Sequence, residues 1–358
     1  MRFAIDHVIW FLDATALNPL LAAIPPLALH HLTNARILFR SAPGALLPYT
    51  LRPLPGLQKL ALGIFGLAVC RRLSHWAARR ALNNGTKLSP FRPEDEIVVV
   101  TGGAGGFGGE AVRKFASAGA KVVVLDVLPL TYPKPSGVYY YRVDLTDYHA
   151  LEQVAKQVSE EIGEPTVVIA NAGICRGKPV LHATPKDIEV TMGVNTLAVF
   201  WCAKVFLPAM IKKNHGHFLI TSSTTAFLST AGITDYAASK AATLAISEGL
   251  QSELKHIYKA PSVRVSALCP SLVRTKMFDT AKSSSSFFWP ELTVEDIANH
   301  MYDIVTSGSS QRRILPLLAT MMVQSRALPE WFRVSIQDAA AGAMVDLKPH
   351  NPLAEGKQ

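Results

Sequence analysis

The chain has 358 residues, 49% of them hydrophobic and 18% charged, which is an apolar composition for a soluble protein. Its net charge of +9 is uneven: residues 1–90 hold ten Lys/Arg and two Asp/Glu (+8), and residues 91–358 hold the other 26 and 25 (+1). The larger part is nearly neutral, which argues against nucleic-acid binding. The four cysteines are widely spaced and form no Cys-x-x-Cys pair, so they predict buried, reduced thiols in an intracellular protein rather than a metal site or a disulfide framework.

The N-terminal segment contains two apolar runs. Residues 14–35 lack Asp, Glu, Lys and Arg and approach the length of a membrane span, although prolines at 19, 25 and 26 interrupt them. The second run, residues 60–70, is too short to cross a bilayer as a helix. It leads into residues 71–80, a basic stretch with a tryptophan that suits the headgroup layer of a membrane.

Three interpretations of residues 1–90 compete. A cleavable signal peptide fits least, because the charged start is a single Arg and Asp6 follows it. A cytosolic extension packed on the rest of the protein is the second. Embedding in one leaflet, or a proline-kinked hairpin, explains both the apolar runs and their basic flank, so we expect membrane attachment. Residues 83–93 then form a linker.

A glycine-rich loop follows the first buried strand that the sequence predicts. Residues 96–101 are a short apolar run typical of a parallel sheet. Gly102-Gly-Ala-Gly-Gly-Phe-Gly-Gly109 comes directly after it, and residues 111–118 are helical in pattern. Glycines let the chain turn tightly and let backbone N–H groups approach a pyrophosphate at the start of a helix. Alone the loop is weak evidence, but its strand–loop–helix context favours a dinucleotide site.

The next predicted strand, residues 121–126, ends in Asp126, about twenty residues beyond the loop. A carboxylate there accepts the adenosine ribose hydroxyls and repels a 2′-phosphate. Gly103 offers no basic side chain to offset that repulsion. We therefore expect NAD(H) rather than NADP(H), with a simple strand cap as the alternative role of Asp126.

Tyr236 and Lys240 lie one turn apart, at i and i+4, on one face of a predicted helix. A phenol titrates near pH 10, and a nearby ammonium favours the phenolate and lowers that value. The pair can therefore form a proton donor and acceptor that works near neutrality, although such pairs also occur on surface helices by chance. Ser223, at the end of the apolar strand at residues 217–222, can hold a carbonyl or alcohol oxygen against the phenol.

These features together make the segment from about Asp95 to Pro316 similar to the short-chain dehydrogenase/reductase family in its compact single-domain form. The features are Thr101-Gly102-x-x-x-Gly106-x-Gly108, the strand-end Asp126 and Tyr236-x-x-x-Lys240. The resemblance implies an α/β fold with a doubly wound, mostly parallel, seven-stranded Rossmann-type sheet.

The resemblance also implies a catalytic set of Asn195, Ser223, Tyr236 and Lys240. Tyr236 would exchange the proton, Ser223 would orient the substrate oxygen, and Lys240 would lower the pKa of Tyr236 and bind the nicotinamide ribose. Asn195, inside one long predicted helix at residues 187–213, would hold a water of the proton path. Ser222 is the rival serine, but the spacing of thirteen residues to Tyr236 favours Ser223.

The cofactor contacts that the family pattern implies run along the whole segment. Asp144 would lie near the adenine, the turn at 171–173 would brace the sheet beside the cofactor, and Thr275 would reach the carboxamide. Ser271 replaces a usual glycine, and an aromatic at 107 replaces a smaller aliphatic, but neither change removes a catalytic group. The full predicted set is Thr101, Gly102, Gly106, Phe107, Gly108, Asp126, Asp144, Asn171, Ala172, Gly173, Tyr236, Lys240, Pro270 and Thr275.

The C-terminal part offers a lid and an extension. Residues 283–290 combine four serines with apolar side chains that suit a mobile lid over the substrate. A helix over 292–306, with Thr293 as its N-cap, and a last strand over 313–317 are predicted to follow. Residues 317–358 contain apolar stretches that fit a lid, a homodimer contact or a second membrane contact, and the sequence does not choose between these.

We therefore expect three parts: a membrane-attached segment and linker (1–90), a dehydrogenase domain (91–316) and a C-terminal extension (317–358). The expected enzyme is an NAD-dependent alcohol dehydrogenase or ketone reductase acting on a hydrophobic, lipid-like substrate, without a metal. Among relatives it looks most like the membrane-associated retinol and hydroxysteroid dehydrogenase branch. That similarity implies the endoplasmic reticulum or lipid droplets, with the catalytic domain facing the cytosol. The alternative is a cofactor-binding scaffold at a lipid surface with little turnover.

Overall fold

The computed structural model describes residues 4–29, 55–88, 90–278, 280–281, 285 and 287–341. Internal packing divides the chain into two units, Met1–Ala81 and Leu82–Gln358. The larger unit contains the sheet and all the candidate site residues. The three-part division expected from the sequence, with boundaries at residues 90 and 316, stays a prediction.

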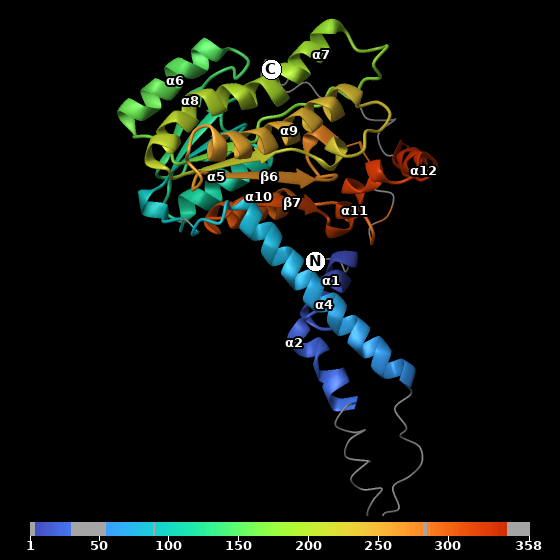
Figure 1. Cartoon of the computed structure of the whole chain (residues 1–358). Coiled ribbons are helices and arrows are strands. Elements are labelled where there is room, and N and C mark those ends of the chain that lie inside the picture. Colours follow the sequence, from blue (N-terminus) through green and yellow to red (C-terminus); the bar gives the residue numbers. More distant parts are fainter. Residues whose placement is uncertain are drawn as a thin grey trace, which may run out of the picture. The chain divides into compact units, whose positions relative to one another are not determined.

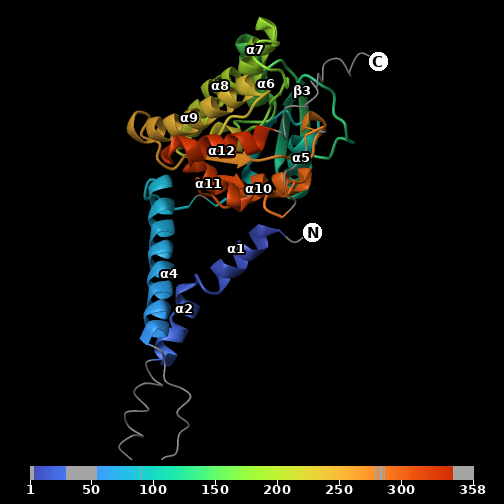
Figure 2. The same cartoon turned by 90° about the vertical axis from the view of Figure 1, so that its right-hand side faces the viewer.

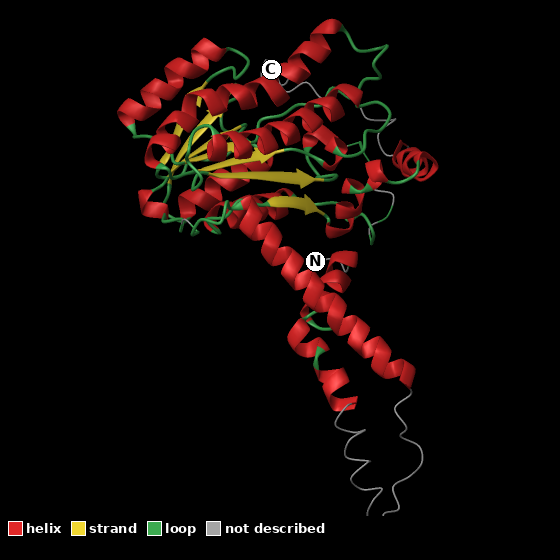
Figure 3. Cartoon of the chain, in the orientation of Figure 1, coloured by secondary structure: helices red, strands yellow, loops and turns green. Residues whose placement is uncertain are grey.

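The larger unit is built on a seven-stranded sheet in which every neighbouring pair of strands is parallel (Figures 1 and 3). The strand order is β3-β2-β1-β4-β5-β6-β7, so the chain reverses direction across the sheet between β1 and β4. This confirms the predicted doubly wound α/β fold. The strands are β1 (Ile97–Thr101), β2 (Lys121–Asp126), β3 (Val138–Arg142), β4 (Val167–Ala170), β5 (His217–Thr221), β6 (Arg264–Pro270) and β7 (Arg312–Leu315).

Helices cover both faces of the sheet (Figure 2). One face carries α5 (Gly106–Ser117) and α10 (Val294–Thr306), and the other carries α6 (Tyr148–Glu161), α8 (Ala198–Lys213) and α9 (Thr234–His256). Thr293 caps α10 through a capping box with Asp296, as the sequence predicts. The shorter elements are η2 (Pro93–Asp95), α7 (Pro185–Met192), η3 (Gly193–Leu197), η4 (Thr224–Ala226), η5 (Lys276–Phe278), η6 (Leu317–Ala319), α11 (Thr320–Val323), η7 (Ser325–Ala327) and α12 (Glu330–Ala341).

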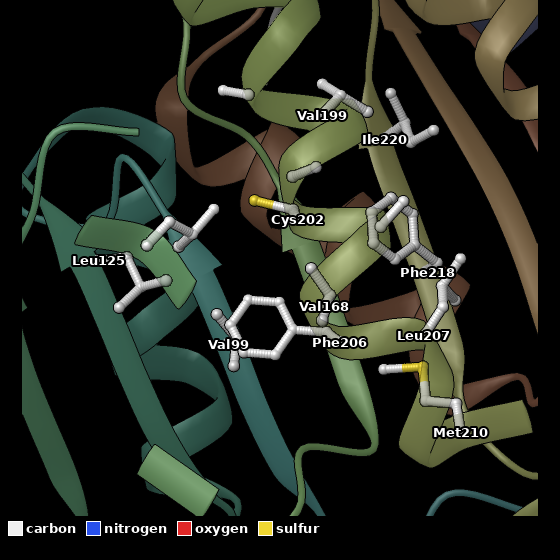
Figure 4. Packing of buried hydrophobic residues seen from close by; sticks show 14 of the residues in the cluster. Val99, Leu125, Val168, Val199, Cys202, Phe206, Leu207, Met210, Phe218 and Ile220 are labelled. Carbon is white, nitrogen blue, oxygen red and sulfur yellow. The ribbon is translucent and has the colours of Figure 1, made fainter. Parts of the chain in front are cut away.

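The core lies in two layers because successive strand residues face opposite sides of the sheet. Val98 and Val100 of β1 pack against α5 and α10, whereas Val99 packs against the α6–α8 side. Figure 4 shows the second layer, where Phe206 of α8 lies beside Val99. Burial on both faces explains why the strands are nearly continuous apolar runs in the sequence.

One connection lacks the helix that the others contain. A helix links each consecutive pair of strands except β2 and β3, where residues 127–137 run without one. Parallel strands ordinarily need a crossover of a dozen or more residues, most often helical. This connection must therefore find its packing and hydrogen bonds elsewhere.

The residues expected to be a linker are docked on the larger unit. The buried guanidinium of Arg264 donates to the backbone oxygens of Asn83 and Lys87 and to the Thr86 hydroxyl. The Asn83 side chain in turn accepts from the backbone N–H of Ser310 at 2.8 Å. Residues 83–87 are thus part of the folded body, because a buried Arg without a carboxylate partner depends on these oxygens.

The smaller unit contains the helices α1 (Ile5–Ala14), α2 (Pro19–Ala22) and α4 (Pro55–Leu82), whose last residue belongs to the larger unit. Ile5–Ala14 and Pro19–Leu29 are together apolar and long enough for a membrane, with a bend of 61° between them. The helical stretch Pro185–Lys213 is also long and apolar enough to cross a membrane, but half of its most apolar part is buried, as in a core helix of a soluble domain. Residues 30–35 of the first apolar run lie outside the described residues.

Helix α4 unites the second apolar run with the basic stretch that follows it. Asp13 of α1 and Arg71 of α4 form an ion pair at 2.8 Å. Large apolar side chains such as Leu60 and Leu67 are about 60% exposed. Cys70 on this helix is exposed too, in contrast to the expected burial, whereas Cys175, Cys202 and Cys269 are buried.

Candidate active site

The carboxyl ends of β1, β4 and β5 are joined by a chain of buried polar groups. The Thr101 hydroxyl accepts from the backbone N–H groups of Asn171 and Ala172 at 2.9 and 3.0 Å. The Asn171 amide donates to the Thr101 backbone oxygen, and the Thr221 hydroxyl donates to the Asn171 side chain. The ammonium of Lys240, on α9, donates a hydrogen bond to the Thr221 backbone oxygen at 2.9 Å. The predicted turn at 171–173 and the predicted Lys240 are therefore parts of one network.

The glycine-rich loop holds positions that tolerate no side chain. Gly102 has a φ of +65°, and a Cβ there would lie 2.8 Å from the Ala172 Cα. A Cβ on Gly108 would lie 2.3 Å from the Gly102 oxygen, and Gly106 has a φ of +56°. Phe107, between them, packs its ring against the apolar core beside α5. The loop thus brings its backbone to the start of α5, where N–H groups favour an anion.

Asp126 ends β2 beside this loop. One carboxylate oxygen accepts from the Ala104 N–H at 2.9 Å, and the other accepts from the Leu128 N–H at 3.0 Å. A carboxylate has about four acceptor positions, so capacity remains for two hydroxyl groups. A Cβ on Gly103 would lie 3.0 Å from Val124 and 3.2 Å from Val112 in the core, so position 103 has no room for a basic side chain. The residues present therefore fit the ribose of a dinucleotide.

Three further predicted contacts occupy the same edge of the sheet. Asp144 accepts from the backbone N–H and the hydroxyl of Thr146 at 2.9 and 2.8 Å, which forms a turn just after β3. Pro270 ends β6, and its backbone oxygen accepts from the Ser223 hydroxyl at 3.3 Å. Thr275 begins the short η5, where its backbone oxygen accepts from the Phe278 N–H at 3.1 Å. The structure shows no direct bond from the side chain of Asp144 to the glycine-rich loop.

Tyr236 and Lys240 occupy the first two turns of α9 and are both buried. The Ser223 side chain lies near the Tyr236 phenol, where it opposes the rise of the phenol pKa, and its hydroxyl donates to the Pro270 backbone oxygen. The Lys240 ammonium lies 5.7 Å from the centre of the Tyr236 ring. Ser222, the rival serine, donates instead to the backbone oxygen of Lys240 at 2.8 Å and so faces the helix. The structure therefore brings Ser223, Tyr236 and Lys240 together and leaves Ser222 out.

Burial controls the protonation of this pair. It raises the pKa of the Tyr236 phenol above its ordinary value, and the neighbouring Cys175 thiol adds to the rise while the Ser223 side chain opposes it. Burial also lowers the pKa of Lys240 to about 8. The expected lowering of the Tyr236 pKa by the ammonium is thus opposed by desolvation, which favours the neutral form of both groups.

Asn195 lies in a break of the helix that the sequence predicts as continuous. The five residues Gly193–Leu197 form a π-helical turn between α7 and α8. The Asn195 side chain accepts from the Ile174 N–H at 2.8 Å and donates to the Ile174 oxygen and to the Ser239 hydroxyl, both at 2.9 Å. Asn195 therefore holds the segment after the 171–173 turn against α9. π turns of this kind often mark functional sites.

Sequence reasoning missed several residues that line or support the site. Cys175 is buried against Tyr236, together with Ile233 and Ala281, and the ring of Phe278 meets the ring of Tyr236 edge-on at 5.8 Å. Their apolar character gave no separate signal, because the same residue types fill the core elsewhere. They give the phenol an apolar surrounding. Residues 283, 284 and 286 of the expected lid lie outside the described residues.

The part of the chain that the structure describes contains no cluster of His, Cys, Asp and Glu that could hold a metal ion. The carboxyl edge of the sheet carries a glycine-rich loop, a carboxylate with unused acceptor positions and a buried phenol near a serine hydroxyl. Such a set can bind a dinucleotide and exchange a proton with an alcohol or a carbonyl.

The chain belongs to the short-chain dehydrogenase family, whose model matches residues 96–285. It is therefore an oxidoreductase acting on CH–OH groups. The expected branch is supported by relatives named as retinol and hydroxysteroid dehydrogenases.

The relatives include dehydrogenase RED2 of Cochliobolus heterostrophus, which is 36% identical over 62% of this chain and 86% of its own length. Estradiol 17-beta-dehydrogenase 11 of Macaca fascicularis is 31% identical over 66% of this chain and 80% of its own. Retinol dehydrogenase 10-B of Danio rerio is 32% identical over 56% of this chain and 69% of its own length.

Solved structures show the same fold. A 4-hydroxyisoleucine dehydrogenase complexed with NADH superposes with a TM-score of 0.54, at 20% identity over 62% of this chain and 96% of that one. The family and this fold indicate a nicotinamide dinucleotide as the cofactor, which the glycine cradle and Asp126 fit.

The lowered pKa of Lys240 predicts how stability depends on pH. An unfolded lysine titrates near pH 10.4. Between pH 8 and pH 10 the unfolded chain therefore binds the proton that the native Lys240 has lost, and this raises the free energy of unfolding as pH increases. In urea unfolding, the free energy of unfolding of wild type should rise across that pH range by roughly 2 kcal/mol more than that of Lys240→Met.

Lys255→Met, at the exposed end of the same helix, is the matched control and should run parallel to wild type. Parallel curves for Lys240→Met as well would show that burial does not lower the pKa of Lys240.

Proposed function

We propose that this protein is an NAD-dependent oxidoreductase that interconverts an alcohol and its ketone or aldehyde on a hydrophobic, lipid-like substrate. The observation that carries the proposal is the meeting of Ser223, Tyr236 and Lys240 in a buried apolar site, with the Lys240 ammonium 5.7 Å from the centre of the phenol ring. Asn195, Ser223, Tyr236 and Lys240 are the proposed catalytic set.

The roles follow from what each side chain can do at its position. Ser223 lies near the phenol, so an oxygen of the substrate can be held between the two hydroxyls. The raised pKa keeps Tyr236 protonated at neutral pH, which suits donation to a carbonyl oxygen; uptake of a proton from an alcohol needs the phenolate. Lys240 would stabilise that phenolate, and a bound nicotinamide dinucleotide supplies the acceptor or donor of the hydride.

Lys240 and Asn195 are proposed to continue the path of the proton beyond Tyr236. The Lys240 ammonium is fixed by the Thr221 oxygen, and a pKa of about 8 lets it gain and lose a proton near neutrality. A Cβ on Gly173 would lie 3.4 Å from the Lys240 nitrogen and 3.5 Å from the Asn195 side-chain oxygen, so both groups approach the same point. We propose that Asn195 and Lys240 share a water there, which continues the proton path.

The cofactor contacts proposed from the sequence divide into three sets. The loop residues at 101–108 and the turn at 171–173 would bind the phosphate and the central ribose, and Asp126 and Asp144 would bind the adenosine half. Pro270 and Thr275, with Tyr236 and Lys240, would face the nicotinamide half. Asp126 is the basis for preferring NAD over NADP, because a 2′-phosphate there would meet a negative charge.

A hydrophobic substrate is supported by the surroundings of the phenol and by the names of relatives. Cys175, Ile233 and Phe278 surround Tyr236 and offer dispersion contacts but no polar partner for a sugar or an acid. Retinol and estradiol dehydrogenases stand among the relatives of this chain. We infer a retinoid, a steroid or a long-chain alcohol as the substrate class.

The N-terminal segment is proposed to attach the enzyme to a membrane or a lipid droplet. The bent apolar helices between residues 5 and 29 and the exposed leucines of α4 support this proposal. The Arg80 guanidinium lies 5.7 Å from the Trp76 ring, and both sit in the basic half of α4 that suits the headgroup layer. The endoplasmic reticulum or lipid droplets, with the catalytic domain facing the cytosol, is the location that we propose.

Tyr236→Phe tests the chemistry. It removes the transferable proton but keeps the ring, so turnover should fall by roughly 10²–10⁴-fold while NADH binds as in wild type. Oxidation of a panel of long-chain and cyclic alcohols, followed by NADH absorbance, and NADH fluorescence titration measure the two quantities. Tyr258→Phe, at an exposed position, should change neither.

Unchanged turnover in Tyr236→Phe would remove the proposed role. A wild type that binds NADH but turns over none of the alcohols would instead favour the cofactor-binding scaffold.

Cofactor choice is tested at Asp126. Titration of wild type should show NADH bound roughly tenfold or more tightly than NADPH. Asp126→Ser should narrow that ratio and also weaken both cofactors, because the Ala104 and Leu128 N–H groups lose their acceptors. Asp303→Ser, on the exposed side of α10, is the control. A wild type that prefers NADPH would show that Asp126 does not bind the ribose.

Membrane attachment is tested by fractionation at low and high salt. Full-length protein should stay with membranes or lipid droplets at high salt and need detergent, because apolar burial outweighs the ~1 kcal/mol per basic residue that salt screens. A chain starting at Leu82 should become more soluble. It starts there, and not at the end of the predicted linker, because Arg264 needs the backbone oxygens of Asn83 and Lys87.

Full-length protein that is soluble without detergent would mean that the N-terminal segment packs on protein instead. The proposal of a lipid-like substrate would then lose one of its supports.

A further inference from the structure

The helix-free connection between β2 and β3 folds back onto the glycine-rich loop. Its residues 128–132, which we call the strap, are held at their start by Tyr140, whose hydroxyl donates to the Leu128 oxygen at 2.9 Å. At its end, the Tyr132 hydroxyl donates to the Gly103 oxygen at 2.6 Å. The N–H and the hydroxyl of Thr131 both donate to the Ala104 oxygen at 2.8 Å. The strap thus binds two consecutive carbonyl groups of the loop.

Those two bonds determine which way the loop peptides face. In a planar trans peptide the C=O and the N–H point in opposite directions. The peptide that carries the Gly103 oxygen also carries the Ala104 N–H, and this N–H donates to Asp126. The next peptide carries the Ala104 oxygen, held by Thr131, so the Gly105 N–H points away from the strap. The strap therefore holds both carbonyl oxygens on its own side of the loop, so neither oxygen faces an anion that approaches from the opposite side.

The strap also accounts for glycines that the family pattern does not require. That pattern uses positions 102, 106 and 108, whereas this loop has glycine at 103, 105 and 109 as well. A Cβ on Gly109 would lie 2.8 Å from a ring carbon of Tyr132, and one on Gly105 would lie 3.1 Å from the Thr131 hydroxyl. Two of the three additional glycines thus make room for the strap. The Arg113 guanidinium lies over the Tyr132 ring, 5.1 Å from its centre.

We propose that the strap is a positioning element for the dinucleotide, with Tyr132 and Gly109 as a matched pair. This rests on the proposed use of the glycine-rich loop for NAD(H). The strap acts on the loop backbone, and it meets Asp126 only through the backbone N–H groups of Leu128 and Ala104, which leave the charge of the carboxylate in place. It therefore sets the affinity for NADH and NADPH alike and leaves the preference between them to Asp126.

The first test is Tyr132→Phe in the full-length protein, which removes one hydrogen bond and keeps the ring. The Kd for NADH, from fluorescence titration, should rise about fivefold, and the Kd for NADPH should rise by the same factor. Turnover at saturating NADH and the melting temperature should stay close to wild type. Tyr139→Phe, at an exposed position of β3, is the control.

The second test is a double-mutant cycle that exploits the close approach. Gly109→Ala should weaken NADH binding by roughly tenfold or more, although alanine favours a helix, because the new methyl group meets the Tyr132 ring. Combined with Tyr132→Ala, which empties that space, Gly109→Ala should add no further loss, so the two effects are not additive. Gly249→Ala, where nothing lies within 4 Å of a Cβ, is the control.

Additive losses in the cycle, or a Tyr132→Phe variant that melts earlier with an unchanged Kd, would overturn the proposal and leave the strap a purely structural element. If Tyr132→Ala does not fold, the Kd values of Tyr132→Phe and Gly109→Ala decide alone. A wild type that binds no NADH would contradict the proposed function itself, which separates that failure from a failure of the strap.

Discussion

The chain of buried polar groups from Thr101 through Asn171 and Thr221 to Lys240 is the interaction on which the site depends. It crosses the carboxyl ends of three strands, β1, β4 and β5, and reaches α9. Each group in it is buried, so each must be paired, because an unpaired polar group in the interior costs about 1–3 kcal/mol. These bonds therefore fix the glycine-rich loop and Lys240, a member of the proposed catalytic set, relative to each other.

The architecture could be predicted from the sequence because parallel sheets leave a strong local signal. Strands buried on both faces read as unbroken apolar runs, and six-residue and five-residue runs such as Lys121–Asp126 and His217–Thr221 are found within a residue or two of their expected positions. The carboxyl ends of such strands meet at one edge, so residues that follow a strand predict a site there. Tyr236 and Lys240 add a helical spacing, which is equally local.

What the sequence did not reveal depends on contacts between distant segments. The π turn at Gly193–Leu197 has no sequence signature, and its reason is visible only when Asn195 meets Ile174 and Ser239. The docking of residues 83–87 depends on Arg264, nearly 180 positions away along the chain. The additional glycines of the loop are visible in the sequence, but the strap that occupies the space beside them lies in the connection between β2 and β3, for which we made no prediction.

Burial both favours and opposes the chemistry proposed for Tyr236 and Lys240. Desolvation disfavours the charged form of both groups, so it raises the pKa of Tyr236 and lowers that of Lys240. A protonated phenol beside a serine hydroxyl is ready to donate a proton, whereas accepting one requires a phenolate that the same burial disfavours. The free energy for that step has to come from groups that stabilise negative charge at the phenol oxygen. The Ser223 side chain lowers the pKa of that phenol, and Lys240, 5.7 Å from the ring centre, can supply a full positive charge, so its protonation couples to that of Tyr236.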